Sequence, residues 1–166
     1  FEESLQINRG MALSNAASAV IQSDFSTSLS RLGGVQLAAG DLVGARQRFE
    51  ESHQIRSRLA AADSTSATAQ DNLAGILLSL AEVQLAAGDL AGARQRFEEG
   101  YEIRSRLAAA NPASAVAQFG LSVALERLGK VQAAAGDLAG ARKRFEESLR
   151  IYGHLAASNL RSAVDR

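Results

Sequence analysis

Apolar residues recur at intervals of three and four along two consecutive stretches in the middle of the chain. This spacing puts them on one side of a helix, so it predicts amphipathic α-helices over 64–87 and 89–110. Gly88 lies between them, where glycine can take the left-handed conformation that ends helices, and Asp89 can cap the next helix. Such a short junction leaves room only for an antiparallel hairpin. The recurring residues are Leu73, Ile76, Leu77, Leu80, Val83 and Leu85, then Leu90, Ala93, Phe97, Ile103 and Leu107.

The whole chain repeats this hairpin with a period of 48 residues. Residues 33–62 match residues 81–110 at 24 of 30 positions, and the Gly-Asp-Leu turn recurs at the same interval. A repeat of this length is typical of stacked supersecondary units, each of which packs on its neighbours. We therefore predict an all-α fold, a single array over 1–166. Its repeats are 1–24 (partial), 25–72, 73–120 and 121–166 (incomplete).

Each repeat contains a first helix, called helix A, and a second, called helix B. Between repeats, Asn111 is a good N-cap and Pro112 suits the first helical position, where its missing N–H costs nothing. We therefore predict that a helix A begins at Pro112. The predicted helices A are 15–39, 64–87 and 112–135; the helices B are 1–13, 41–62, 89–110 and 137–157, with 159–166 entering a further repeat.

The recurring residues resemble the tetratricopeptide repeat. The first full copy has Leu29, Leu32-Gly33, Gly40-Asp41, Ala45 and Phe49, and the pattern returns 48 and 96 residues later. The resemblance implies a right-handed α-solenoid of about three and a half antiparallel helix hairpins, whose helices A line a concave groove for a protein or peptide. The period exceeds the roughly 34 residues of the family, so the unit is similar to extended repeats of large bacterial arrays. Gln36, Gln84 and Gln132 occupy the position of the family's helix-A aromatic residue.

Positions at which the copies differ are candidates for binding, because the shared positions build the stack. On helix A, three variable positions at i, i+4 and i+7 lie on one side of the helix. The resemblance puts this side in the groove, so we predict that it contacts a partner. The alternative for its leucines is packing against a neighbouring helix, and the basic and Asn residues with which some family members hold a C-terminal carboxylate are not matched. The set is Ser30, Gly34 and Leu37; Leu78, Glu82 and Leu85; Glu126, Lys130 and Ala133.

The composition argues against several other classes of function. The 18 basic residues balance the 18 acidic ones, and both Arg and Glu recur along each helix B, which does not favour nucleic-acid binding. No apolar run approaches the roughly 18–20 residues of a membrane span. The chain has no Cys, and neither His53 nor His154 recurs in the other copies. We therefore predict no enzyme activity, no cofactor, no metal, no nucleic-acid partner and no membrane insertion.

The leading hypothesis is a protein-interaction module. Two alternatives remain open: a structural spacer or self-assembling segment, which forms a homo-oligomer through open repeat ends, and a sensor arm of a larger bacterial signalling or effector protein. Phe1 aligns with mid-helix Phe49, so we expect the true N-terminus to be absent, and a cytoplasmic location is the default expectation. The open ends would be Phe1, Leu5 and Ile7 on one side and Ile151, Leu155 and Leu160 on the other.

Overall fold

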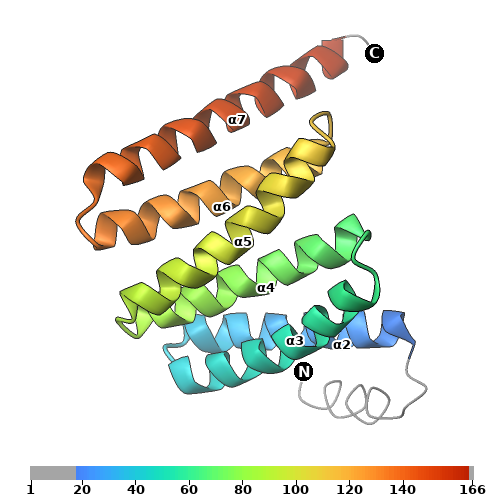
Figure 1. Cartoon of the computed structure of the whole chain (residues 1–166), viewed down its shortest axis with the longest axis vertical. Coiled ribbons are helices and arrows are strands. Elements are labelled where there is room, and N and C mark those ends of the chain that lie inside the picture. Colours follow the sequence, from blue (N-terminus) through green and yellow to red (C-terminus); the bar gives the residue numbers. More distant parts are fainter. Residues whose placement is uncertain (1–17, 165–166) are drawn as a thin grey trace.

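Six α-helices make up the part of the chain that the structure describes. The structure is a computed structural model, which describes the backbone of residues 18–164 and the side chains of residues 18–158. The helices pair into three antiparallel hairpins that stack in chain order (Figure 1). The predicted all-α solenoid is confirmed. Helices A are α2 (Ala19–Ala38), α4 (Ala67–Ala86) and α6 (Ala115–Ala134), and helices B are α3 (Leu42–Ala62), α5 (Leu90–Ala110) and α7 (Leu138–Val164).

The turn inside each hairpin has the predicted chemistry. Gly40 and its two counterparts have φ of 80° to 84°, a conformation that a side chain would strain. Asp41 caps α3, since its Oδ1 accepts a hydrogen bond of 2.8 Å from the backbone N–H of Gly44. A Cβ atom on Gly44 would collide with the Asp41 carboxylate, so this position also requires glycine.

Gln36 explains one departure from the family pattern. Its Nε2 donates a hydrogen bond of 3.0 Å to Oδ2 of Asp41, and the same bond recurs from Gln84 and Gln132 at 3.0 and 3.1 Å. The glutamine thus ties the last turns of helix A to the residue that caps helix B. At this position of helix A, a glutamine that forms a hydrogen bond replaces the aromatic residue of the family pattern.

The junction between repeats differs from the prediction. Asn111 ends α5 instead of starting α6, because its N–H donates to the carbonyl of Leu107 at 3.2 Å. Ser114 is the N-cap of α6, and its Oγ accepts from the N–H of Ala117 at 3.2 Å. The predicted helix start at Pro112 is therefore wrong. The proline lies in the turn, where it donates no hydrogen bond to either helix.

The last helix is also longer than predicted. The prediction ended it at 157 and assigned 159–166 to a further repeat, whereas α7 continues to Val164. Asn159 aligns with Asn111 and Leu160 with Pro112, but a missing proline does not account for the longer helix, because α3 ends at this junction with Ser64 at the proline position. The predicted helix over 1–13, the start of the helix predicted over 15–39 and residues 165–166 lie outside the described residues.

One phenylalanine per repeat joins three helices. Phe97 of α5 is 1% exposed and packs with Ala81 of α4 and with Leu128 and Val131 of α6. Small residues make room for the ring in every copy: a Cβ atom on Gly33 would lie 2.7 Å from Cε1 of Phe49. Phe49 is likewise 3% exposed and packs with Ile76, Leu80 and Val83 of α4, the next helix A.

Phe97→Ala is expected to lower the free energy of unfolding by about 3–5 kcal/mol, because a buried ring is lost and a cavity remains. Phe145→Ala is the matched control one repeat later. It should cost clearly less, since Phe145 is 38% exposed. Urea unfolding followed by circular dichroism measures both, with Phe97→Leu as a milder variant if the alanine variant does not fold. Equal costs at the two positions would contradict the described packing.

Candidate partner-binding surface

The helices A lie closer together than the helices B. α4 contacts both α2 and α6, whereas no contact joins two helices B among the described elements. In a curved stack the elements on the inner side are the ones that approach each other. The described hairpins thus bring the exposed sides of α2, α4 and α6 next to one another, and the helices B cover the outer side.

Three leucines of the predicted binding set contribute to the core. Leu78 is 6% exposed and packs with Phe97, Leu128 and Val131, and a Cβ atom on Gly100 would lie 3.1 Å from its Cδ2. The packing alternative therefore holds for Leu78, whose side chain is not accessible to a partner. Leu85 is half-buried against the same cluster, and Leu37 is half-buried against the cluster around Phe49.

The small residues of the set differ in exposure. Ser30 is half-buried, and its Oγ donates to the carbonyl of Ser26 at 2.9 Å and shares a hydrogen bond of 2.9 Å with Oγ of Ser52. Its hydroxyl therefore belongs to the contact between α2 and α3. Gly34 is exposed, and nothing lies within 4 Å of a Cβ atom placed on it. Gly34 leaves space on the surface of α2.

The charged residues of the set form two ion pairs on α4 and α6. Glu82 pairs across the helices with Arg127 at 2.5 Å, and Glu126 pairs with Lys130 at 3.1 Å. The four side chains are 31% to 48% exposed. Ion pairs this accessible contribute about 0–1 kcal/mol each to stability, so their charges can be exchanged for those of a partner at low cost.

Arg127 was missed by the sequence reasoning. It belongs to the variable series Arg31, Ser79 and Arg127, which lies beside the predicted set on helix A. Variation between the copies was the signal that could have identified it. Its pairing with Glu82 depends on how two helices A approach each other, which the repeat pattern does not show.

One exposed stripe of the helices B does not vary between the copies. Arg46 and Glu50 form an exposed ion pair of 2.8 Å, and the same pair recurs without change as Arg94 with Glu98 at 2.8 Å and Arg142 with Glu146 at 2.7 Å. Exposure by itself therefore does not make a position variable in this chain. The exposed side of the helices A varies between copies, while this stripe on the helices B does not.

The arrangement of the His, Asp and Glu side chains bears on a possible metal or catalytic site. Among residues 18–158, no group of three or more His, Asp or Glu side chains could hold a metal ion. His53 is half-buried, with Nε2 at 3.3 Å from Oγ of Ser57. Burial, and then the positive charge of Arg96, lowers the pKa of His53. His154 is exposed.

The pKa of His53 leads to a prediction about pH. Because the folded state holds this proton less tightly than the unfolded state, the stability that neutral His53 contributes is present above the unfolded pKa of about 6.5. It is lost as the pH falls through the folded pKa. His53→Gln is expected to reduce the difference in free energy of unfolding between about pH 7.5 and pH 5. Urea titrations at both values test this, and an unchanged difference would contradict it.

A helix that crosses a lipid bilayer must be both long and apolar. None of the helices among the described residues combines that length with that apolar character.

Comparison with known proteins identifies the repeat. The family model described as tetratricopeptide repeat matches residues 27–51 and 74–99. Each match extends from helix A through the Gly-Asp turn into helix B, in the first and second full copies. No curated protein matches the chain.

Proposed function

Since the chain is an array of tetratricopeptide repeats, we propose that it is a non-enzymatic scaffold that binds a peptide or a domain of another protein. Repeats of this family generally mediate protein–protein interaction. We assign the binding surface to the exposed side of α2, α4 and α6. Its residues are Arg31 and Gly34 on α2, Glu82 on α4, and Glu126, Arg127 and Lys130 on α6.

The observation that carries this proposal is the contrast between two exposed surfaces of the same repeats. Gly34, Glu82 and Lys130 are three different residues at one position of helix A, whereas Arg46, Arg94 and Arg142 are identical on helix B. Packing gives the copies no reason to keep this outer stripe and to change Gly34, Glu82 and Lys130, although another exposed position of the helices B, that of Gln54, Glu102 and Arg150, also differs. A partner that runs along the helices A, and meets each copy with a different part of itself, supplies such a reason.

The surface favours a partner with both charges. The position of Gly34 is open, that of Glu82 is acidic and that of Lys130 is basic, so the polarity changes along the stack. Arg127 and Glu126 supply the opposite charges next to Glu82 and Lys130. A bound segment could therefore replace each ion pair in turn with one of its own side chains.

The double variant Glu82→Gln with Lys130→Gln tests the surface. The partner is first identified by cross-linking to the wild-type array. The double variant should bind this partner about tenfold more weakly or worse, which corresponds to about 1.4 kcal/mol. Its stability should fall by less than about 1 kcal/mol per pair removed. The control Arg94→Gln with Glu98→Gln removes the same charges from the outer stripe and should bind normally. Equal losses in both variants, measured by calorimetry, would contradict the assignment.

A second candidate function, self-assembly, is favoured by the C-terminal end of the stack. Leu138, Phe145 and Leu149 of α7 are 69%, 38% and 71% exposed. They lie on the side of a helix B that, at Phe97, is covered by the next helix A. The predicted contact residue Ile151 is instead 8% exposed, and Leu155 is half-buried. Phe1, Leu5, Ile7 and the side chain of Leu160 lie outside the described residues.

If the ends of two copies stack, the molar mass from light scattering should rise with concentration. Leu149→Arg should suppress the rise without unfolding the chain, because this side chain is 71% exposed. A wild-type chain that stays monomeric at high concentration would contradict self-assembly.

A further inference from the structure

In each hairpin, one residue of helix A faces one residue of helix B near the junction between repeats, and the chemistry of this pair differs between the three hairpins. In the second hairpin, Nε of Arg104 donates to Oδ1 of Asp71 at 3.0 Å, and the arginine side chain is 12% exposed. In the third, Phe119 and Tyr152 occupy these positions with their rings edge to face, 5.9 Å between centroids. In the first, the positions hold Ser23 and Arg56. Two of the pairs are chemically matched, and the third leaves an arginine without its carboxylate.

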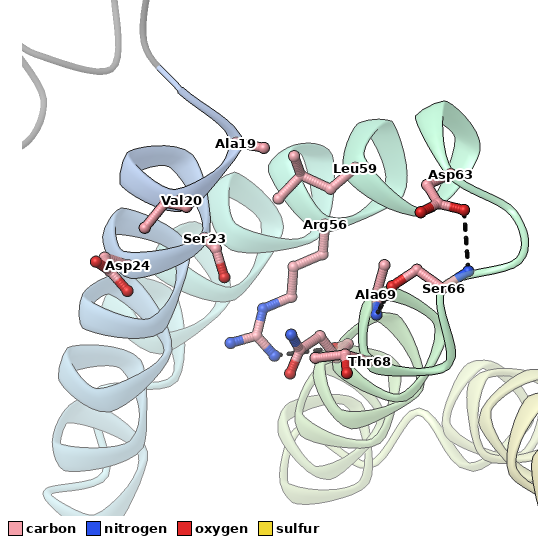
Figure 2. A pocket seen from close by; sticks show the side chains of 11 residues that line it. Ala19, Val20, Ser23, Asp24, Arg56, Leu59, Asp63, Ser66, Thr68 and Ala69 are labelled. Carbon is pink, nitrogen blue, oxygen red and sulfur yellow. Dashed lines mark hydrogen bonds between the residues drawn. The ribbon is translucent and has the colours of Figure 1, made fainter.

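Arg56 lies in a pocket between the first two repeats. Figure 2 shows its side chain extending from α3 into the space between α2 and α4. The pocket has a volume of about 400 Å³, and Ala19, Val20, Leu59 and Ala69 supply apolar walls. The equivalent pocket at Arg104 is smaller, at about 240 Å³.

The hydrogen-bond partners of Arg56 are neutral. Its Nε donates to Oγ of Ser26 at 3.2 Å, and its Nη1 donates to the carbonyl of Asn72 at 2.9 Å. Its Nη2 makes a long bond of 3.5 Å to Oγ1 of Thr27. A guanidinium has about five N–H donors, so further donors are left for a ligand. The two hydroxyls have no equivalent at Arg104, where Ala74 and Gly75 stand.

Arg56 forms no ion pair with a described residue. Among the described residues, no carboxylate lies within the 4.0 Å of an ion pair. Asp71 is the acid whose charge raises the pKa of Arg56, but it is bound to Arg104, and burial lowers the pKa of Arg56 more strongly. Asp63 lines the pocket, and its Oδ1 is taken by Thr65 and Ser66. Asp24 also lines the pocket, but no ion pair joins it to Arg56. All the hydrogen bonds of this half-buried cation thus go to neutral groups, and the two carboxylates of the pocket lining form no ion pair with it.

We propose that this pocket binds the carboxylate of an Asp or Glu side chain on a partner protein. The chain itself shows the arrangement, because Asp71 places such a carboxylate on the equivalent arginine. The bound carboxylate would accept hydrogen bonds from Arg56, and the stem of the acidic side chain would lie against the apolar walls. Charge-assisted bonds of this kind are the strong ones in proteins. The site uses none of the residues tested above for the groove, so either proposal can fail without the other.

The probe is the peptide acetyl-Ala-Glu-Ala-amide, titrated into the full chain while the arginine Nε–Hε signals are followed by NMR. The signal of Arg56, assigned by its loss in Arg56→Gln, should shift and saturate. The signal of Arg104, whose carboxylate is already present, is the control within the same molecule and should shift much less. Acetyl-Ala-Gln-Ala-amide should produce no saturable shift. Acetyl-Ala-Gln-Ala with a free C-terminus tests the other source of a carboxylate, and stronger binding of this peptide would overturn the assignment to a side chain.

Two substitutions at one position separate charge from shape. Ser23→Asp copies the residue at 71 and should weaken binding of the Glu peptide by at least about tenfold, because the new carboxylate competes for Arg56. Ser23→Asn has nearly the same size without the charge and should retain binding. Circular dichroism confirms that both variants fold, and Arg56→Gln replaces Ser23→Asp if that variant does not. Equal shifts at Arg56 and Arg104, or unchanged binding in both loss-of-binding variants, would overturn the proposal.

Discussion

The packing of one phenylalanine per repeat between two helices A is the contact on which the array depends. Phe97 contacts Ala81 in its own hairpin and Leu128 and Val131 in the next. A helix hairpin of this size cannot bury its own apolar side, so stability comes from neighbours. The small residues at positions 33, 81 and 129 are part of the same contact, because they leave room for the phenylalanine ring. Where no following helix A is described, the ring of Phe145 is exposed, along with Leu149.

This constraint divides the remaining surface into two parts. The outer stripe of the helices B does no packing and makes the same ion pair in every copy, with 2.7 to 2.8 Å between the charged atoms. The inner side of the helices A does no packing either at Gly34, Glu82 and Lys130, yet it differs in each copy. The proposed scaffold function and its binding surface rest on this difference. The buried Leu78 shows why variation alone is insufficient, since a position can also vary because its packing partners vary.

The junction between repeats combines structural and binding chemistry in one place. An arginine reaching between two helices A needs compensation for its charge, and the second hairpin supplies it through Asp71. The third hairpin removes the charge and uses two aromatic rings. The first hairpin keeps the charge, and Arg56 donates only to two hydroxyls of α2 and to the carbonyl of Asn72 on α4, which satisfy hydrogen bonds without neutralising the cation. The proposed carboxylate site thus corresponds to the pair of Arg104 and Asp71 with Ser23 in place of the aspartate.

The existence of the helices, their order and the chemistry of the hairpin turn were predicted from the sequence alone. They depend on local rules, namely helical periodicity, the left-handed glycine and the capping aspartate, and these rules act identically in every copy. The tertiary structure decided what depends on the approach of separate helices. Leu78 and Lys130 occupy the same side of helix A, but Phe97 and the neighbouring helix bury only the leucine. The ion pair of Arg127 with Glu82 depends on the distance between two helices, which the periodicity does not give. Ser114 instead of Asn111 caps α6, because the periodicity does not show which side chain binds the free N–H groups. The unpaired charge of Arg56 likewise became visible only when three helices were seen around it.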